Sequence, residues 1–327
     1  MAGDTIRLVS TGMWVPERVL TNADLERMVD TTHDWIVERT GIHERRIAAD
    51  DVGVVDMGCY SAQNALDDAG LGPDDVDAII VSTATPDRLL PATACDIQAR
   101  LGAHRAVAFD VWGACSGWLY ALNVARGLVL TGQVENALCI AAEKMSAITD
   151  WSDRATCVLF GDAAGAAVVR RSGEEGRGII ASYMRSDGSL AELLCRAPEN
   201  PKLGVAEIAA RNGYLQMAGR EVFKNAVRSM CEAVDAVLDQ AGVSKGEVDL
   251  LVPHQANIRI IEATAKYARV PMDRVWVNVD RYGNTSSATI PVSLHEARMA
   301  GRITDGSLVL VVTFGAGLTW AGNLIRW

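Results

Sequence analysis

The chain has 327 residues, of which 49% are hydrophobic and 22% are charged, and its formal net charge is −10. This length can bury one large core or two lobes that share one, and the negative charge argues against nucleic acid as a partner. No apolar run approaches the roughly 18 residues of a membrane helix, and residues 1–30 contain no apolar segment typical of a secretion signal. We therefore expect a cytoplasmic protein with neither a nucleic-acid nor a membrane partner.

The first half of the chain contains a helix–strand pattern that returns in the second half. Residues 65–81 align without a gap with residues 237–253, a displacement of 172 residues that places Gly70 on Gly242. Each copy predicts a helix, a glycine stop, a short acidic loop and a buried strand. The apolar spacing places the first helix at about 52–69 and the second at about 219–241.

The later parts of the two halves also correspond, as strand, turn, helix and strand. In the first half these are a strand at 105–109, the turn at Cys115, a helix to about 130 and a strand at 135–142. In the second half they are a strand at 275–279, the turn at 282–287, a helix to about 300 and a strand at 307–313. Cys115 and Asn284 therefore occupy equivalent corners. Two such copies predict an α/β fold built from two duplicated halves. We place them at 1–172, carrying the cysteine, and 173–327, carrying His254 and Asn284, joined near the Gly- and charge-rich stretch 171–178.

Cys115 lies between a predicted strand and a predicted helix, and small residues flank it on both sides. A thiol at a helix N-terminus feels the positive end of the backbone dipole, which favours the thiolate. The turn resembles the serine elbow of hydrolases with sulfur in place of oxygen. The local sequence also fits a small residue that fills a tight bend, and it does not decide between the two interpretations.

Three further motifs carry groups suited to acyl chemistry. His254 directly follows a predicted strand, Asn284 precedes a predicted helix, and glycines surround Ala316 after the last long strand. Taken singly, these fit a loop histidine, a helix N-cap and a Gly-rich turn. The repeat changes this, because it brings Asn284 into symmetry with Cys115 and puts His254 in the same half. A Cys–His–Asn set around one cleft is equipped for nucleophilic acyl transfer.

The seven cysteines give no sign of a metal or disulfide framework. Their number is odd and none forms a C-x-x-C pair, so we interpret all but Cys115 as small buried hydrophobic residues in a reducing compartment. We expect no metal and no redox cofactor.

Together, the motifs resemble those of the β-ketoacyl-acyl carrier protein synthase III family of the thiolase superfamily. The residues that carry the resemblance are D-W-I-V-E-R-T-G-I at 34–42, A-C-S-G at 114–117, D-R-A-T at 153–156, F-G-D-A-A-G-A-A at 160–167, G-R-E-V-F at 219–223, P-H-Q-A-N-I-R-I at 253–260, Y-G-N-T-S at 282–286 and F-G-A-G-L-T-W at 314–320. The resemblance covers almost the whole chain. It implies a five-layered αβαβα thiolase-like fold and a homodimer.

The resemblance also implies a decarboxylative Claisen condensation in two stages. Cys115 would attack an acyl-CoA, which is a substrate and not a resident cofactor, to give acyl-Cys115. Malonyl-acyl carrier protein would then lose carbon dioxide, while His254 and Asn284 donate hydrogen bonds to its thioester oxygen. The oxyanion hole would consist of the N–H groups of Cys115 and Ala316.

Three positions match residues that hold CoA in the family. Trp35 and Arg154 would sandwich the adenine ring, a role suited to an indole and a guanidinium, and Arg39 would contact a CoA phosphate. Their alternative interpretation is an ordinary interface tryptophan and two surface arginines.

Three basic residues match positions at which an acidic carrier protein docks. Arg259 and Lys266 are seven residues apart and hence on one face of a helix, and Lys224 is the third. Solvated surface charge is the alternative interpretation.

The sequence departs from the family pattern near the nucleophile. Trp112 and Ser116 are unusual neighbours of Cys115, and Ala316 replaces a common glycine. Leu90 stands where a phenylalanine from the partner subunit often closes the acyl pocket, so we hypothesise that longer or branched acyl groups are accepted.

Other functions remain as alternatives to the condensing enzyme. One is a synthase III-like acyltransferase of secondary metabolism, which would make an ester, an amide or an alkylquinolone precursor. The others are a cysteine hydrolase and a non-catalytic scaffold.

Overall fold

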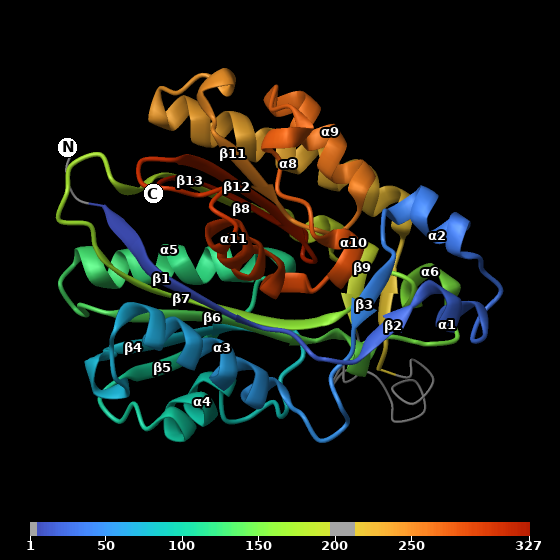
Figure 1. Cartoon of the computed structure of the whole chain (residues 1–327), viewed down its shortest axis with the longest axis horizontal. Coiled ribbons are helices and arrows are strands. Elements are labelled where there is room, and N and C mark those ends of the chain that lie inside the picture. The colour runs from blue at the N-terminus through green and yellow to red at the C-terminus, as the bar shows by residue number, and fades with distance from the viewer. Residues whose placement is uncertain (1–4, 197–212) are drawn as a thin grey trace.

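A computed structural model describes residues 5–196 and 213–327, and its framework is two stacked sheets (Figure 1). The first sheet has five strands. In spatial order they are β1 (Ile6–Trp14), β7 (Asp162–Arg171), β6 (Ala137–Lys144), β4 (Ala78–Ser82) and β5 (Val107–Val111). Only β4 pairs in parallel with both of its neighbours, β5 and β6.

The second sheet repeats this arrangement. In spatial order its strands are β11 (Leu250–Pro253), β12 (Leu308–Gly315), β13 (Thr319–Arg326) and β8 (Gly178–Ser186). Here β11 pairs in parallel with β12, and, as in the first sheet, the two pairs toward the far edge are antiparallel. A single parallel bridge from Leu251 to Val275 stands where the first sheet has β5. The duplication predicted from the sequence is therefore present in the pairing of the strands.

Helices fill three layers around the two sheets (Figure 1). The outer face of the first sheet is covered by α3 (Val54–Ala69) and α4 (Thr93–Leu101), and that of the second by α8 (Gly219–Ala241) and α9 (Ile258–Ala268). Between the sheets lie α5 (Gly117–Leu130) and α11 (Thr289–Met299). The fold is thus the predicted five-layered αβαβα arrangement, and the buried apolar clusters follow its layers.

Short elements lie beside the sheets and connect the layers. They are β2 (Val19–Thr21), α1 (Asn22–Glu26), α2 (His33–Thr40), β3 (Glu44–Arg46), α6 (Arg154–Cys157), β9 (Leu194–Arg196), β10 (Leu215–Met217) and α10 (Val279–Tyr282). Across residues 5–196 and 213–327, no helix is long and apolar enough to cross a membrane.

The repeated helices end as the sequence predicts. Gly70 terminates α3 with φ of 66° and Gly242 terminates α8 with φ of 65°. This left-handed conformation favours glycine and closes a helix by turning its backbone N–H back onto the last carbonyl groups. The prediction that a glycine ends the helix in each copy of the repeat is therefore confirmed.

Two predictions of regular structure were wrong. The predicted strand 275–279 is reduced to the bridge at Val275, because the Gln255 side chain accepts hydrogen bonds from the N–H groups of Asn278 (2.9 Å) and Val279 (3.1 Å). Those N–H groups cannot join a ladder, and α10 begins instead. The Gly-rich segment 313–320 does not follow the last strand but turns the chain from β12 into β13.

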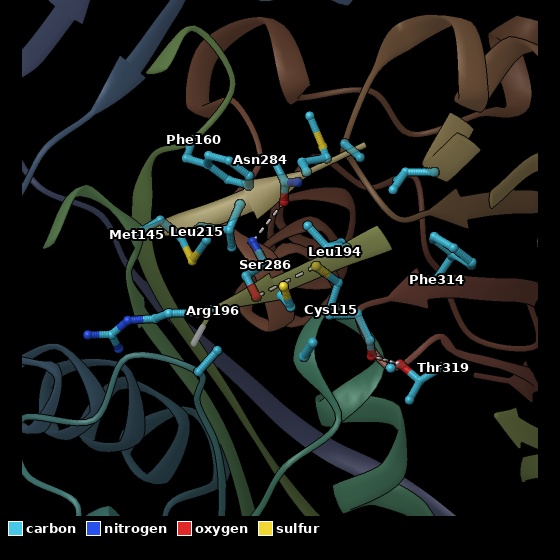
Figure 2. Close-up of a pocket in the computed structure, with 18 of the residues that line it drawn as sticks. Cys115, Met145, Phe160, Leu194, Arg196, Leu215, Asn284, Ser286, Phe314 and Thr319 are labelled. Carbon is cyan, nitrogen blue, oxygen red and sulfur yellow. Dashed lines mark hydrogen bonds between the residues drawn. The ribbon is translucent and has the colours of Figure 1, made fainter. Parts of the chain in front are cut away.

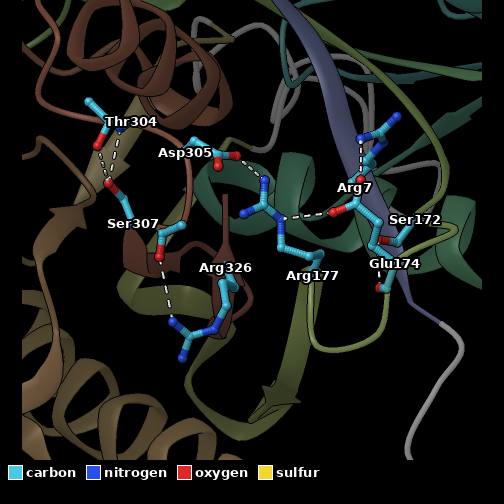
Figure 3. Close-up of polar contacts among 9 residues, drawn as sticks. Arg7, Ser172, Glu174, Arg177, Thr304, Asp305, Ser307 and Arg326 are labelled. Carbon is cyan, nitrogen blue, oxygen red and sulfur yellow. Dashed lines mark hydrogen bonds and ion pairs between the residues drawn. The ribbon is translucent and has the colours of Figure 1, made fainter.

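Polar contacts hold the connection between the two sheets in place (Figure 3). Arg177 forms an ion pair with Asp305 of the second half, and its Nε lies 3.7 Å from Glu174 Oε2. Arg7 Nη1, on β1, lies 3.7 Å from the other oxygen of Glu174. The predicted join at 171–178 therefore runs between the last strand of one sheet and the first strand of the other, and the division at 172/173 stays a prediction.

Candidate active site

One cavity of about 1040 Å³ gathers the four central candidates, Cys115, His254, Asn284 and Ala316. They come from both halves of the chain. Figure 2 shows Cys115 and Asn284 on the wall of this cavity, with Ser286 between them. The structure thus brings together residues that are far apart in the sequence, as the repeat predicts.

Cys115 lies in a tight turn, Ala114–Ser116, between β5 and α5. Ala114 has φ of 45°, and a Cβ added to Gly113 would lie 2.9 Å from Gly117 Cα, so the bend requires a glycine there. Only 8% of Cys115 is exposed, and its thiol donates a hydrogen bond to Ser286 Oγ at 3.6 Å. The turn therefore presents sulfur to the cavity and shields it from bulk water.

The expectation that the helix N-terminus produces a resting thiolate is not met. Burial raises the pKa of the Cys115 thiol to about 12, and the hydrogen bond between Cys115 and Ser286 only partly opposes this. The thiol is therefore protonated at neutral pH. It must lose its proton as it attacks a substrate.

His254 follows β11 and is 3% exposed. Its backbone N–H donates to Val312 O at 2.9 Å, which fixes the chain beside β12. Burial lowers the pKa of the imidazole to about 3, so the ring is neutral near pH 7. Within the described part of the chain, the buried Nδ1 has no hydrogen-bond partner. A neutral imidazole can donate one hydrogen bond and accept another.

Asn284 is fixed by backbone and side-chain hydrogen bonds. Its N–H donates to Leu159 O at 2.8 Å, and its carbonyl accepts from Gly161 N at 3.2 Å. The side-chain oxygen accepts from Ser286 N at 2.9 Å. This leaves the amide N–H groups of Asn284 as the donors available to a ligand.

The two corners are equivalent, but Asn284 is not the counterpart of Cys115 within them. The 172-residue displacement places Ala114 on Ser286 and Cys115 on Ser287. The backbone agrees, because Ala114 and Ser286 have φ of 45° and 52°. Asn284 lies three residues before Ser287 and reaches the cavity from the entry to the turn.

The segment at Ala316 packs directly on the Cys115 turn. A Cβ added to Gly315 would lie 2.7 Å from Cys115 N, so only glycine permits this approach. Thr319 Oγ1 donates to Gly113 O at 3.0 Å, and Ser116 Oγ donates to Thr319 O at 3.2 Å. Ser116, unusual in sequence, thus connects the Cys115 turn to the β12–β13 hairpin.

The three predicted CoA contacts form one cluster. The guanidinium carbons of Arg39 and Arg154 lie 4.6 Å and 5.0 Å from the centre of the Trp35 ring. Asn257, which lines the cavity, donates to Arg39 O at 2.8 Å. An indole flanked by two cations is therefore linked to the wall of the cavity.

The three predicted docking residues are exposed on neighbouring helices. Lys224 lies on α8, and Arg259 and Lys266 lie on α9. The guanidinium carbon of Arg259 lies 5.6 Å from the centre of the Phe223 ring, and Phe223 lines the cavity. Lys224 and Arg259 therefore adjoin cavity-lining residues, whereas Lys266 lies seven residues further along α9.

Two apolar residues near the site are exposed to an unusual degree. Leu90 is 85% exposed and Trp112 is 64% exposed. Trp112 and the neighbouring Leu89 line the cavity, whereas Leu90 does not line it in its own chain.

Sequence reasoning missed two groups around Cys115. Ser286 was quoted only as part of a motif, yet its hydroxyl contacts the Cys115 sulfur. Glu143 was given no role, yet its buried carboxylate binds the adjacent Ser287. The repeat carried a signal for this turn, because it places Ser286 and Ser287 at the positions of Ala114 and Cys115. Over the described ranges, no group of three or more His, Cys, Asp and Glu residues is placed to hold a metal ion.

The buried His254 predicts a pH dependence of stability. Its folded pKa lies below the unfolded value of 6.5, so the unfolded chain binds more protons between these values and stability falls as the pH falls. We expect the stability difference between the wild type and His254→Gln to shrink by about 1.4 kcal/mol per pH unit between about pH 6 and pH 4. Urea unfolding at several pH values measures this. A difference that stays constant with pH would contradict a buried neutral imidazole.

Two stacked duplicated halves, with cysteine, histidine and asparagine on one cavity, define the class of thiolase-type condensing enzymes. The family model described as 3-oxoacyl-[acyl-carrier-protein] synthase III matches residues 109–188. The model of the C-terminal part of the same family matches residues 238–327. The β-ketoacyl-[acyl-carrier-protein] synthase III of Symbiobacterium thermophilum is 49% identical over 98% of both chains.

Solved structures agree with this assignment. The 3-oxoacyl-[acyl-carrier-protein] synthase III of Aquifex aeolicus superposes with a TM-score of 0.92 at 47% identity, covering 99% of this chain and 100% of that one. The corresponding synthase of Thermus thermophilus gives 0.92 at 47% identity, covering 98% and 99%. The chain belongs to the 3-oxoacyl-[acyl-carrier-protein] synthase III family and is an acyl-transferring condensing enzyme.

Proposed function

We propose that the protein condenses an acyl-CoA primer with malonyl-acyl carrier protein to start fatty-acid synthesis, through an acyl-Cys115 intermediate. The observation that carries the proposal is the convergence of a nucleophile and two neutral hydrogen-bond donors on one cavity. The first stage needs the nucleophile. The second needs donors to a developing enolate and not a strong base.

In the first stage, Cys115 sulfur attacks the thioester carbon and CoA leaves as its thiol. As the new C–S bond forms, the Cys115 thiol loses its proton, and as the C–S bond to CoA breaks, the CoA sulfur takes up a proton. The tetrahedral oxygen accepts hydrogen bonds from the N–H groups of Cys115 and Ala316. Support for this hole comes from Gly315, whose lack of a side chain lets the Ala316 segment lie against the Cys115 turn.

In the second stage, malonyl-acyl carrier protein loses carbon dioxide and the electron pair of the broken C–C bond forms an enolate. His254 and the amide of Asn284 donate hydrogen bonds to its oxygen. The enolate carbon then attacks the thioester carbon of acyl-Cys115, the C–S bond to Cys115 breaks, and the β-ketoacyl product leaves while the Cys115 sulfur takes up a proton and becomes a thiol again. Support comes from the low pKa of His254, because a neutral ring stabilises an oxyanion without protonating it fully.

The Trp35 cluster would hold the nucleotide part of CoA. The indole is partly exposed, and two guanidinium groups flank it. A planar adenine can stack against such groups, and the arginines can bind phosphate oxygens. Arg39 would supply the phosphate contact, and Arg154 with Trp35 the stacking surface.

The exposed cations Lys224, Arg259 and Lys266 would dock the acidic carrier protein. We expect Arg259→Glu and Lys266→Glu each to raise the KM for malonyl-acyl carrier protein about tenfold, because charge reversal repels an acidic partner. Acylation by acyl-CoA should change less than about twofold. Steady-state kinetics at low and moderate salt measure both.

The matched control for this docking prediction is Arg302→Glu, which reverses an exposed charge outside the cavity. An equal rise in KM for the control would point to net charge and not to a docking face.

A homodimer would form through the edge of the first sheet at β5. Edge strands offer unpaired backbone groups, and this edge carries exposed Val107 with Leu89, Leu90 and Trp112 nearby. Pairing of two copies would cover this apolar surface and bring Leu90 of the partner subunit to the acyl pocket. A leucine there would admit longer or branched primers. Competition among acyl-CoA substrates tests this, and a strict preference for acetyl would refute it.

The compartment would be the reducing cytoplasm. The buried Cys59, Cys115, Cys139 and Cys157 are free thiols in the structure, which fits a protein kept in a reducing environment.

A sequential incubation tests the proposed reaction. The protein receives acetyl-CoA and then malonyl-acyl carrier protein, and mass spectrometry identifies the products. Acetoacetyl-acyl carrier protein and carbon dioxide are the expected products. Acylation without condensation would favour an acyltransferase of secondary metabolism. CoA release without any product would indicate a hydrolase, and no acylation a scaffold.

A further inference from the structure

A buried carboxylate that the proposed reaction does not use lies behind the Cys115 turn. Glu143, near the end of β6, is fully buried. One of its oxygens accepts from Ala84 N at 2.9 Å and from Thr85 Oγ1 at 3.1 Å. The other accepts from Ser287 Oγ at 2.6 Å and from Ser287 N at 3.3 Å. Burying a carboxylate is costly unless hydrogen bonds compensate, and here both oxygens are bonded to backbone and hydroxyl donors.

The contacts of Glu143 join two segments that line the cavity. One contains Thr83 and Ala84, and the other contains Ser286, which lies beside Cys115. Burial raises the pKa of Glu143, and hydrogen bonds from Ser287, Ala84 and Ser286 oppose this. Each oxygen of Glu143 accepts a hydrogen bond from a backbone N–H group. In a Glu143→Gln variant, the side-chain NH₂ group would replace one of these oxygens and would face a backbone N–H group that needs an acceptor.

The duplicated architecture explains why a carboxylate can stand there. The 172-residue displacement takes Glu143 onto Gly315 and Cys115 onto Ser287. In one half, Gly315 lies against the Cys115 backbone with no side chain between them. In the other half, Glu143 fills the equivalent place and binds Ser287. The corner without the nucleophile is thus held by a side chain.

We propose that Glu143 is a positioning residue, whose carboxylate holds the Ser286–Ser287 turn so that Asn284 and Ser286 keep their places beside Cys115. The chain of contacts is short. Glu143 binds Ser287, the preceding N–H of Ser286 fixes the Asn284 side chain at 2.9 Å, and the Ser286 hydroxyl accepts from the Cys115 thiol at 3.6 Å. Ser286 carries φ of 52°, a conformation that a non-glycine residue keeps only when its surroundings enforce it.

The inference rests on the proposed condensation, and its test separates the two. The variants are Glu143→Gln, Ser287→Ala and their combination. Because a misplacement of about 1 Å can cost about 100-fold in rate, we expect each single change to lower kcat for condensation by about 10- to 100-fold. The KM for acyl-CoA should stay within about threefold, because the Trp35 cluster is untouched. The double variant should be little worse than either single one, since both remove the same contact.

The matched control is Asp162→Asn on the adjacent strand. Asp162 is also fully buried and accepts from Ala48 N (2.8 Å), Ser146 N (2.8 Å) and Ser146 Oγ (2.6 Å), but it does not line the cavity. Asp162→Asn should lower the melting temperature, but it should not lower kcat selectively while KM stays unchanged. Ser287→Ala serves if Glu143→Gln does not fold.

The outcomes decide between the explanations. A wild-type protein that forms no β-ketoacyl product would refute the proposed function. With an active wild type, additive effects of the two changes would overturn the positioning role. So would folded variants with unchanged kcat, or a loss of kcat matched by the Asp162→Asn control.

Discussion

The Cys115→Ser variant is expected to lose acylation by acyl-CoA and, with it, condensation, by about three orders of magnitude or more. A serine hydroxyl is a poor nucleophile without a base within reach, and the ring of His254 is weakly basic because burial lowers its pKa to about 3. The measurement is the rate of CoA release and of β-ketoacyl product formation under saturating substrates.

Cys59→Ser is the control for this change. Cys59 is as buried as Cys115, and burial also raises its pKa, to about 11, but it lies outside the cavity. It should retain activity. A Cys115→Ser protein that still releases CoA and forms product at the wild-type rate would remove Cys115 from the reaction.

The second large effect is expected for His254→Ala, which should lower the second stage far more than the first. Loss of one donor to an oxyanion costs about 100- to 1000-fold in rate, and we expect this factor in carbon dioxide release from malonyl-acyl carrier protein. Asn284→Ala should behave similarly, because its amide is the other donor. Acylation of Cys115, measured without the malonyl substrate, should fall less than about tenfold.

His295→Ala controls for the loss of an imidazole. His295 is partly buried and hydrogen-bonds Thr11, away from the cavity. It should leave the ratio of the two stages unchanged. An equal loss of both stages in His254→Ala would instead make His254 part of the activation of Cys115.

The internal repeat allowed much of the fold to be predicted. The helix predicted at 219–241 begins and ends at those residues, and Gly70 and Gly242 stop the paired helices. These features are local, because apolar spacing and a glycine in the left-handed region act within a few residues. The duplication then predicted that Cys115, His254 and Asn284 face one cavity, since equivalent ends of two stacked sheets meet at one place.

Features set by contacts distant in sequence escaped prediction. The sequence of segment 275–279 is typical of a strand, but the side-chain oxygen of Gln255 accepts hydrogen bonds from the N–H groups of Asn278 and Val279. Gly322 and Asn323 weaken the strand pattern of β13 in the sequence. The glycine is needed because α8 packs closely there, and a Cβ at Gly322 would lie 2.8 Å from Val237 Cγ2. The protonated state of Cys115 follows from burial that the turn alone does not reveal.

The central claim is that Cys115 carries the acyl group between the two stages. Mass spectrometry of the peptides formed after incubation with labelled acetyl-CoA tests it most directly. We predict one acetyl group on the peptide that contains Cys115, and its transfer into β-ketoacyl product when malonyl-acyl carrier protein is added. Label on another residue, or label on Cys115 that malonyl-acyl carrier protein fails to remove, would contradict the account.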